Sequence, residues 1–112
     1  MKVYISGMIT SLKHDQYRKA FKEAATYLVD KGCDPIDPSD LGKPEHHSWE
    51  YYMRKAIPQL CECDGIYMLT GWERSKGAKL EHTIAKSLGM TVFEQNREEN
   101  LDCGSYGKQE LG

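Results

Sequence analysis

Short apolar runs in the chain have the length and composition of buried β-strands. Residues 2–6 (KVYIS), 65–69 (GIYML) and 90–93 (MTVF) are rich in β-branched, aromatic and other apolar side chains. The 65–69 run is almost entirely apolar, which predicts a central strand of a parallel sheet. A weaker fourth strand is predicted at 33–37 (CDPID), where Pro35 cannot donate a ladder hydrogen bond and therefore favours a sheet edge.

Three segments between these strands repeat apolar residues at helical spacing. The first has Asp15 as a candidate N-cap and Gly32 as a candidate C-terminal stop. The second follows Ser48, also a candidate N-cap, and contains Pro58, which predicts a kink or an early end. The third precedes Gly89. The apolar positions of the first two are Tyr17, Ala20, Phe21, Ala24, Ala25, Leu28, Trp49, Tyr52, Met53, Ala56, Ile57 and Leu60.

The alternation of strands and helices predicts a flavodoxin/Rossmann-like α/β fold. We expect a three-layer sandwich, with a mostly parallel four-stranded sheet in the order 2-1-3-4 and helices on both faces. A functional site is then expected at the carboxyl ends of the first and third strands, beside the point where the strand order reverses. We expect residues 1–94 to form a single domain and 95–112 to form a polar C-terminal tail that is either loose or an arm on a partner subunit.

An acidic residue, Glu81, falls on the apolar face of the third helix. At about 100° of rotation per residue it lies near the middle of that face. Because it is about one turn into the helix, the N-terminal N–H groups and dipole would favour its ionised form. Two interpretations stay open: a sheltered nucleophile or cation stabiliser, or a helix-start residue that reaches solvent around the edge. The apolar face comprises Gly77, Ala78, Leu80, Ile84, Ala85 and Leu88.

Composition excludes several classes of protein. The 112 residues carry 15 basic and 17 acidic side chains, mixed along the chain, for a net charge of −2. This distribution shows neither a basic stripe for a nucleic-acid polymer nor an acidic tail. Apolar runs are too short for a membrane span, and the start, MKVYISG, lacks the apolar core of a signal peptide. We expect a cytoplasmic protein that does not bind a membrane.

The four cysteines are expected to be reduced thiols, since no secretion signal accompanies them. Cys61 and Cys63, with His46 and His47 nearby, do not match the usual spacings of zinc ligands. We therefore predict neither a metal nor a cofactor, and a cysteine-based metal or redox protein is the weakest of the functional hypotheses.

Three stretches together resemble a known family. The stretches that carry the resemblance are KVYISG at the start, the second half from Trp49 to Met90 and, above all, GWERSKGAKLEH. The chain resembles a small phage and bacterial family of unknown function (DUF4406-like), which is related to nucleoside 2-deoxyribosyltransferases and deoxynucleotide N-glycosidases. The resemblance covers roughly residues 1–94. It implies that Glu81 attacks the anomeric carbon of a deoxynucleoside or of its 5′-monophosphate.

The resemblance also implies binding residues. Tyr4 and Gly7 would line the sugar site, with Met8 beside them, and Ser75 and Gly77 would meet a 5′-phosphate. The chemistry fits these residue types, because a carboxylate can trap an oxocarbenium-like centre as a glycosyl ester with retention of configuration, and a helix N-terminus binds phosphate. Ser75 as a plain N-cap is an equally good interpretation.

Two further residues are candidates for contacting the ligand, but each could instead have a purely structural role. Trp72 is either an aromatic wall for the base or a packing residue. Asp37, before Pro38, either binds sugar or base or makes a common Asp-Pro turn.

Two positions depart from the family pattern. The superfamily usually carries an assisting Asp where this chain has Ala56, and relatives tend to read Ser-Gly-Pro where Gly7 is followed here by Met8. The leading hypothesis is N-glycosidic cleavage or deoxyribosyl transfer through Glu81. The alternative is a non-catalytic nucleotide-binding protein of the same fold, in phage nucleotide metabolism or defence. In both, the partner is a small nucleoside or nucleotide, and a homodimer or larger homo-oligomer is expected.

Overall fold

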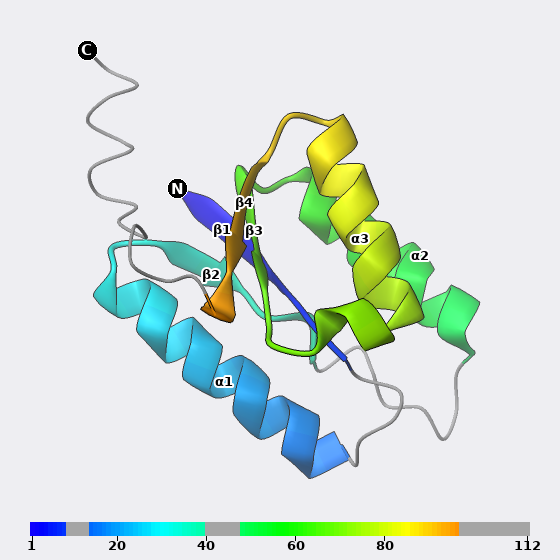
Figure 1. Cartoon of the computed structure of the whole chain (residues 1–112), viewed down its shortest axis with the longest axis horizontal. Coiled ribbons are helices and arrows are strands. Elements are labelled where there is room, and N and C mark those ends of the chain that lie inside the picture. The colour runs from blue at the N-terminus through cyan, green and yellow to red at the C-terminus, as the bar shows by residue number, and fades with distance from the viewer. Residues whose placement is uncertain (9–13, 40–47, 97–112) are drawn as a thin grey trace.

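The computed structural model describes residues 1–8, 14–39 and 48–96, and these form one α/β unit (Figure 1). A four-stranded parallel sheet has the order β2-β1-β3-β4, as the sequence predicts. A short 3₁₀ turn, η3 (Trp72–Arg74), precedes the last helix. The strands are β1 (Lys2–Ser6), β2 (Asp34–Ile36), β3 (Gly65–Met68) and β4 (Thr91–Glu94), and the helices are α1 (His14–Asp30), α2 (Trp49–Cys61) and α3 (Lys76–Ser87).

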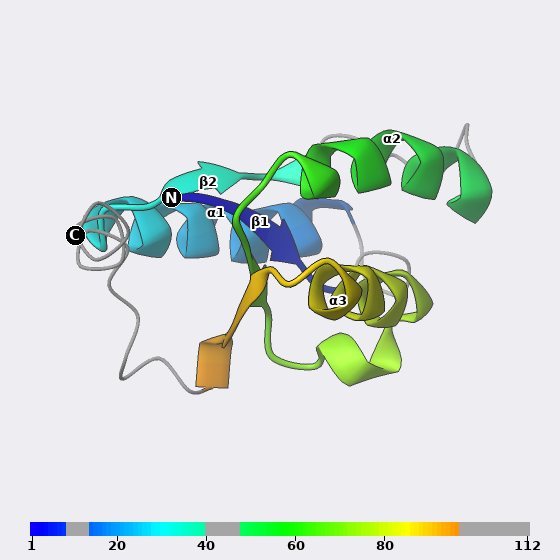
Figure 2. The same ribbon diagram turned by 90° about the horizontal axis from the view of Figure 1, so that it is seen from above.

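The two faces of the sheet bury different residues because successive side chains of a strand point to opposite sides. Val3 and Ile5 of β1 pack with α1 on one face. Tyr4 of β1 packs with residues of α2 and α3 on the other. Figure 1 shows α1 alone on its side of the sheet, and Figure 2 shows α2 and α3 covering the opposite side.

The carboxyl ends of β1 and β3 lie next to each other, at the point where the strand order reverses. Ser6 is in register with Met68, and the backbone N–H of Leu69 donates to the Ser6 carbonyl at 2.8 Å. A side chain at Gly7 would come within 2.9 Å of Leu69 Cβ, so the closeness of these two strand ends depends on glycine. This edge is where ligands bind in open α/β sheets.

Several predicted helix ends are confirmed. The Ser48 hydroxyl caps α2 by accepting from the Tyr51 N–H at 3.1 Å. Gly32 and Gly89 follow α1 and α3 with φ of 84° and 74°, a conformation that favours glycine.

One other helix prediction is wrong, and of the kink or early end predicted at Pro58 the early end is wrong. α1 begins at His14, so Asp15 lies inside its first turn rather than at the N-cap. α2 does not end at Pro58 but continues to Cys61. Leu60, in that last turn, is completely buried, and this packing outweighs the hydrogen bond that proline cannot donate.

The cysteine prediction holds in part. Cys61 and Cys63 are free thiols, but Cys33 is disulfide-bonded, so the expectation of reduced thiols is wrong for that residue. Cys103 and most of the predicted tail lie outside the described residues. Among the helices that are described, none is long and apolar enough to cross a membrane.

Candidate functional site

Glu81 is the only buried acidic side chain in the described part of the chain, with 2% of its surface exposed. It lies on the face of α3 that packs on the sheet, together with Ala78 and Ala85. Leu80 and Leu88 were predicted to share this face but are 38% and 59% exposed. The buried face is therefore turned away from the two leucines, and Glu81 points directly into the protein rather than around its edge.

Both carboxylate oxygens of Glu81 accept short hydrogen bonds from β1. The Tyr4 hydroxyl donates to Oε2 at 2.5 Å, and the Ser6 hydroxyl donates to Oε1 at 2.6 Å. Tyr4 and Ser6 are two residues apart on one strand, so both face α3. O–H donors at this distance from a carboxylate are typical of charge-assisted hydrogen bonds.

Burial and hydrogen bonding shift the ionisation of Glu81 in opposite directions. Burial raises its pKa and the bonds from Ser6 and Tyr4 lower it, and the net result is a rise from the usual 4.5 to about 7. We expected the N-terminus of α3 to keep Glu81 ionised, and this cause is wrong. Glu81 is the sixth residue of the helix, beyond the turn whose N–H groups are free, and the hydroxyls of β1 support its charge instead.

Tyr52 of α2 extends the hydrogen-bonded group. It forms a side-chain hydrogen bond with Tyr4. Since Tyr4 has one hydroxyl proton and donates it to Glu81, Tyr52 must donate to the Tyr4 oxygen. Burial, followed by the charge of Glu81, raises the pKa of both tyrosines above the usual 10.0, so both stay neutral donors at physiological pH.

Ser6 and Tyr52 were not among the residues predicted for the site. The signal for Ser6 was available, because it is two positions after Tyr4 on a strand and must share its face. Tyr52 was counted as an apolar position of its helix, and nothing in the helical pattern shows that its hydroxyl meets Tyr4.

Ser75 and Gly77 lie at the start of α3, where the sequence placed a phosphate. The Ser75 hydroxyl accepts from the Ala78 N–H at 3.1 Å, so its role as the N-cap is confirmed. A side chain at Gly77 would come within 3.2 Å of Met53 Sδ and 3.3 Å of Trp49 Nε1. Gly77 therefore has a packing role, the close approach of α2 and α3, which the sequence did not reveal.

Trp72 packs against the core cluster that contains Tyr4 and Ala78, and its ring contacts with single residues lie on another side of α3. Its ring stacks on His82 at 4.4 Å between centroids, and its Nε1–H donates to Glu94 Oε1 at 3.5 Å. His82 is one residue after Glu81, about 100° around the helix. The structure thus gives Trp72 a packing role and does not bring it onto the carboxylate.

Gly7 and Met8 follow directly after Ser6 at the carboxyl edge, as predicted. A side chain at Gly71, in the loop after β3, would come within 4.0 Å of Met8 Cε. Met8 therefore lies where the loops after β1 and β3 meet, next to the strand end that carries Ser6.

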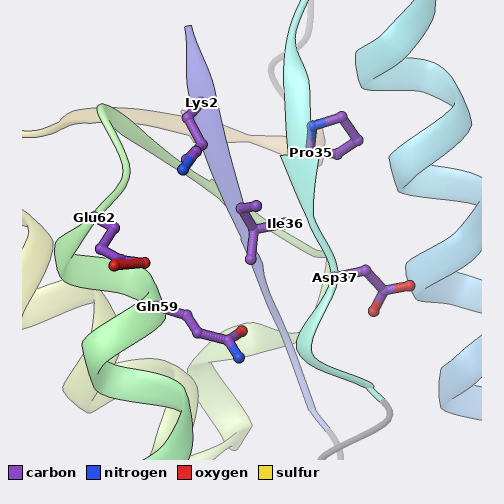
Figure 3. A pocket seen from close by; sticks show the side chains of 6 residues that line it. All are labelled: Lys2, Pro35, Ile36, Asp37, Gln59 and Glu62. Carbon is purple, nitrogen blue, oxygen red and sulfur yellow. The ribbon is translucent and has the colours of Figure 1, made fainter.

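Asp37 follows β2 and makes a local turn, in which its carboxylate accepts from the Ser39 N–H at 2.9 Å. It is also one of six residues around an open pocket of about 400 Å³ between β2 and the end of α2. Figure 3 shows Asp37 pointing toward α1, away from Gln59 and Glu62 on the other wall. Neither Glu81 nor its hydrogen-bond partners line this pocket, so it is separate from the buried carboxylate.

The described residues contain no group of three or more His, Cys, Asp or Glu side chains placed to hold a metal ion. The chemistry that this part of the chain offers near Glu81 is that of hydroxyls and one carboxylate.

Fold and site together define a parallel α/β protein with a sheltered carboxylate beside its topological switch point. The family DUF4406, a domain of unknown function, matches residues 1–94, and the chain belongs to that family. No curated protein matches the chain.

Proposed function

We propose that the protein cleaves the N-glycosidic bond of a deoxynucleoside or deoxynucleoside 5′-monophosphate, with Glu81 as the nucleophile. The observation that carries the proposal is the burial of Glu81 between two hydroxyl donors at the carboxyl edge of the sheet. A carboxylate at such a place lowers stability, which is a common feature of functional sites. The resemblance to deoxyribosyltransferases assigns that position the same role.

The reaction follows from the properties of the carboxylate. One oxygen of Glu81 attacks C1′ of the deoxyribose while the C1′–N bond breaks, and the electron pair of that bond leaves with the base, which takes a proton from water. The result is a glycosyl ester on Glu81. Water, or a second base in a transferase, then attacks C1′ from the opposite side and gives up a proton to the hydroxide that the first step left. The ester C1′–O bond breaks, its electron pair returns to Glu81, and the configuration at C1′ is retained.

The test is release of free base. The purified protein is incubated with the four common deoxynucleosides and their 5′-monophosphates, with and without a second free base, and the products are separated by chromatography. We expect base release or base exchange by the wild type and a loss of at least a hundredfold in Glu81→Gln. No product from any of the eight compounds, or equal rates for both proteins, would refute the proposal.

A second candidate function is nucleotide binding without turnover. The burial of Ala56 favours it, because the position that usually carries an assisting Asp is completely enclosed by the core. Calorimetry separates the two functions. A binding protein would take up a deoxynucleoside monophosphate that chromatography then recovers intact, whereas the enzyme would return base and sugar.

We also propose that the protein acts as a homodimer or larger homo-oligomer, as the resemblance implies. Two large apolar side chains that remain exposed, Leu80 on α3 and Leu88 just after it, support this proposal.

A further inference from the structure

We propose that Ser6 is a positioning residue for Glu81, which holds Oε1 as the attacking oxygen and sustains the charge of the carboxylate. This inference rests on the proposed role of Glu81 as a nucleophile. It adds a residue that neither the sequence pattern nor the family resemblance had assigned to the site.

The two hydrogen bonds to Glu81 differ in what surrounds their donors. Tyr4 is completely buried, and its hydroxyl is bonded both to Glu81 Oε2 and to Tyr52. Moving the Tyr4 oxygen away from Oε2 would break both bonds and displace a ring packed in the core. Oε2 is therefore held firmly and is unsuited to forming a new bond to carbon.

Ser6 holds Oε1 in a different way. It is the last residue of β1, at the carboxyl edge of the sheet, and its described side-chain hydrogen bond is the one to Glu81. A serine hydroxyl turns by rotation about one bond, without displacing a ring. When substrate arrives, Ser6 can turn aside and free Oε1, while the Tyr4 bond keeps the carboxyl group oriented.

Ser6 also affects the fraction of Glu81 that is ionised. The titratable groups facing Glu81 in the described residues are Tyr4 from β1 and, behind it, Tyr52 from α2. Both tyrosines have a pKa above the usual value and stay neutral near pH 7. The bonds from Ser6 and Tyr4 are therefore what opposes the effect of burial on the Glu81 pKa, and the Ser6 bond is the larger of the two influences.

The first experiment measures the titration of Glu81 without any substrate. Protein labelled with ¹³C at the Glu side-chain carboxyl is titrated by NMR, and the Glu81 signal is assigned by its absence in Glu81→Gln. Ser6→Ala should raise the Glu81 pKa from about 7 to about 8 or higher, because a hydrogen bond to the charged form is lost. Ser6→Cys, with a weaker donor of similar size, should give an intermediate value.

Ser39→Ala is the matched control. Ser39 is as buried as Ser6, at 1% exposure, but it follows β2, and its described hydrogen bond is donated by its backbone N–H to Asp37, which alanine would keep. Its replacement should leave the Glu81 titration unchanged. A Glu81 pKa that is the same in wild type, Ser6→Cys and Ser6→Ala would overturn the inference. Ser6→Cys keeps this test available if Ser6→Ala does not fold.

The second experiment follows base release against pH. In Ser6→Ala the acid limb of kcat/KM should move to higher pH, with a loss of about tenfold at pH 6 that narrows toward pH 9. A uniform loss at every pH would contradict a role through the Glu81 charge. The titration needs no turnover, so the two proposals can fail separately. If the Glu81 pKa changes in Ser6→Ala but the wild type releases no base, the proposed reaction is refuted. The contribution of Ser6 to the Glu81 charge is then still supported.

Discussion

The carboxyl group of Glu81 is costly to the fold in its charged form. The interior of a small domain would hold an apolar side chain at this position more cheaply, because burial penalises the charge. The hydroxyls of Tyr4 and Ser6 reduce the penalty but do not remove it, since the pKa remains at about 7. A residue whose usual pKa is 4.5 is thus poised to gain or lose its proton near neutrality.

This pKa makes the free energy of unfolding depend on pH. Folding raises the pKa of Glu81, so the folded state binds the proton more tightly than the unfolded state does. Glu81 therefore costs no stability below pH 4.5, and its cost grows as the pH rises until it is complete above about pH 7. The difference between the pKa of Glu81 in the unfolded state and in the folded state corresponds to about 3 kcal/mol in the free energy of unfolding.

Glu81→Gln should remove this dependence. The stability of Glu81→Gln relative to wild type should increase by about 3 kcal/mol between pH 4.5 and pH 8, as measured by urea unfolding at several pH values. Glu23→Gln, an exposed acid on α1, is the control and should show little change. A constant difference between Glu81→Gln and wild type over this range would mean that the Glu81 pKa is not raised by folding.

The helices and strands could be predicted from the sequence because their periods are strong and their ends are marked. The almost entirely apolar 65–69 run identified the central strand, and Ser48 and Gly89 marked helix ends. The rotation of α3 about its own axis could not be predicted in this way. One broad apolar stripe includes Leu80, Gly77 and Ala85. A period of 3.6 residues does not indicate which part of that stripe is buried.

The hydrogen bonds of the site could not be predicted in the same way. The position of Glu81 on a helix face was visible in the sequence, but its partners come from a strand and a helix far away along the chain. Ser6 could have been found from the alternation of β1, given Tyr4. Tyr52 could not, because a tyrosine in an amphipathic helix is as well explained by its ring as by its hydroxyl.

The start of α3 gives a prediction about phosphate. If the Ser75 hydroxyl donates to a 5′-phosphate while still capping the helix, a monophosphate should bind more tightly than its nucleoside by about 1 to 3 kcal/mol. Ser75→Asp retains a side chain that caps helices but adds a negative charge. It should abolish the preference for the monophosphate in calorimetry, and its melting temperature shows whether the cap is kept. Equal affinities of the wild type for both ligands would instead favour the transferase branch of the relatives.

The buried face of α2 gives a second prediction at this scale. Ala56 is completely enclosed, with Leu60 and Met68 in the same cluster. Ala56→Asp should therefore lower stability by more than about 3 kcal/mol in urea unfolding, because it buries a charge without a partner. Ala20→Asp, on the exposed face of α1, should cost less than about 1 kcal/mol. A stable Ala56→Asp with faster base release would show instead that this face opens onto the site.

At the scale of the whole molecule, the proposed assembly depends on which apolar surface is covered. A single chain of 12.8 kDa exposes Leu80 on α3, Leu88 just after it, and Val29 on α1, on the opposite side of the sheet. We expect sedimentation equilibrium to show a dimer or larger species. Leu80→Lys should weaken it, and Val29→Lys should not. A monomer at all concentrations, or equal effects of the two substitutions, would refute the role proposed for α3.

The role of Glu81 as a nucleophile is tested most directly by the mass of the reacting protein. Protein quenched in acid during turnover of the best deoxynucleoside or monophosphate is digested and analysed by mass spectrometry. A covalent sugar adduct should be found on the peptide that contains Glu81, and it should be absent from Glu81→Gln treated in the same way. An adduct on a different residue, or base release by wild type without any adduct under conditions where hydrolysis of the ester is rate-limiting, would contradict this role.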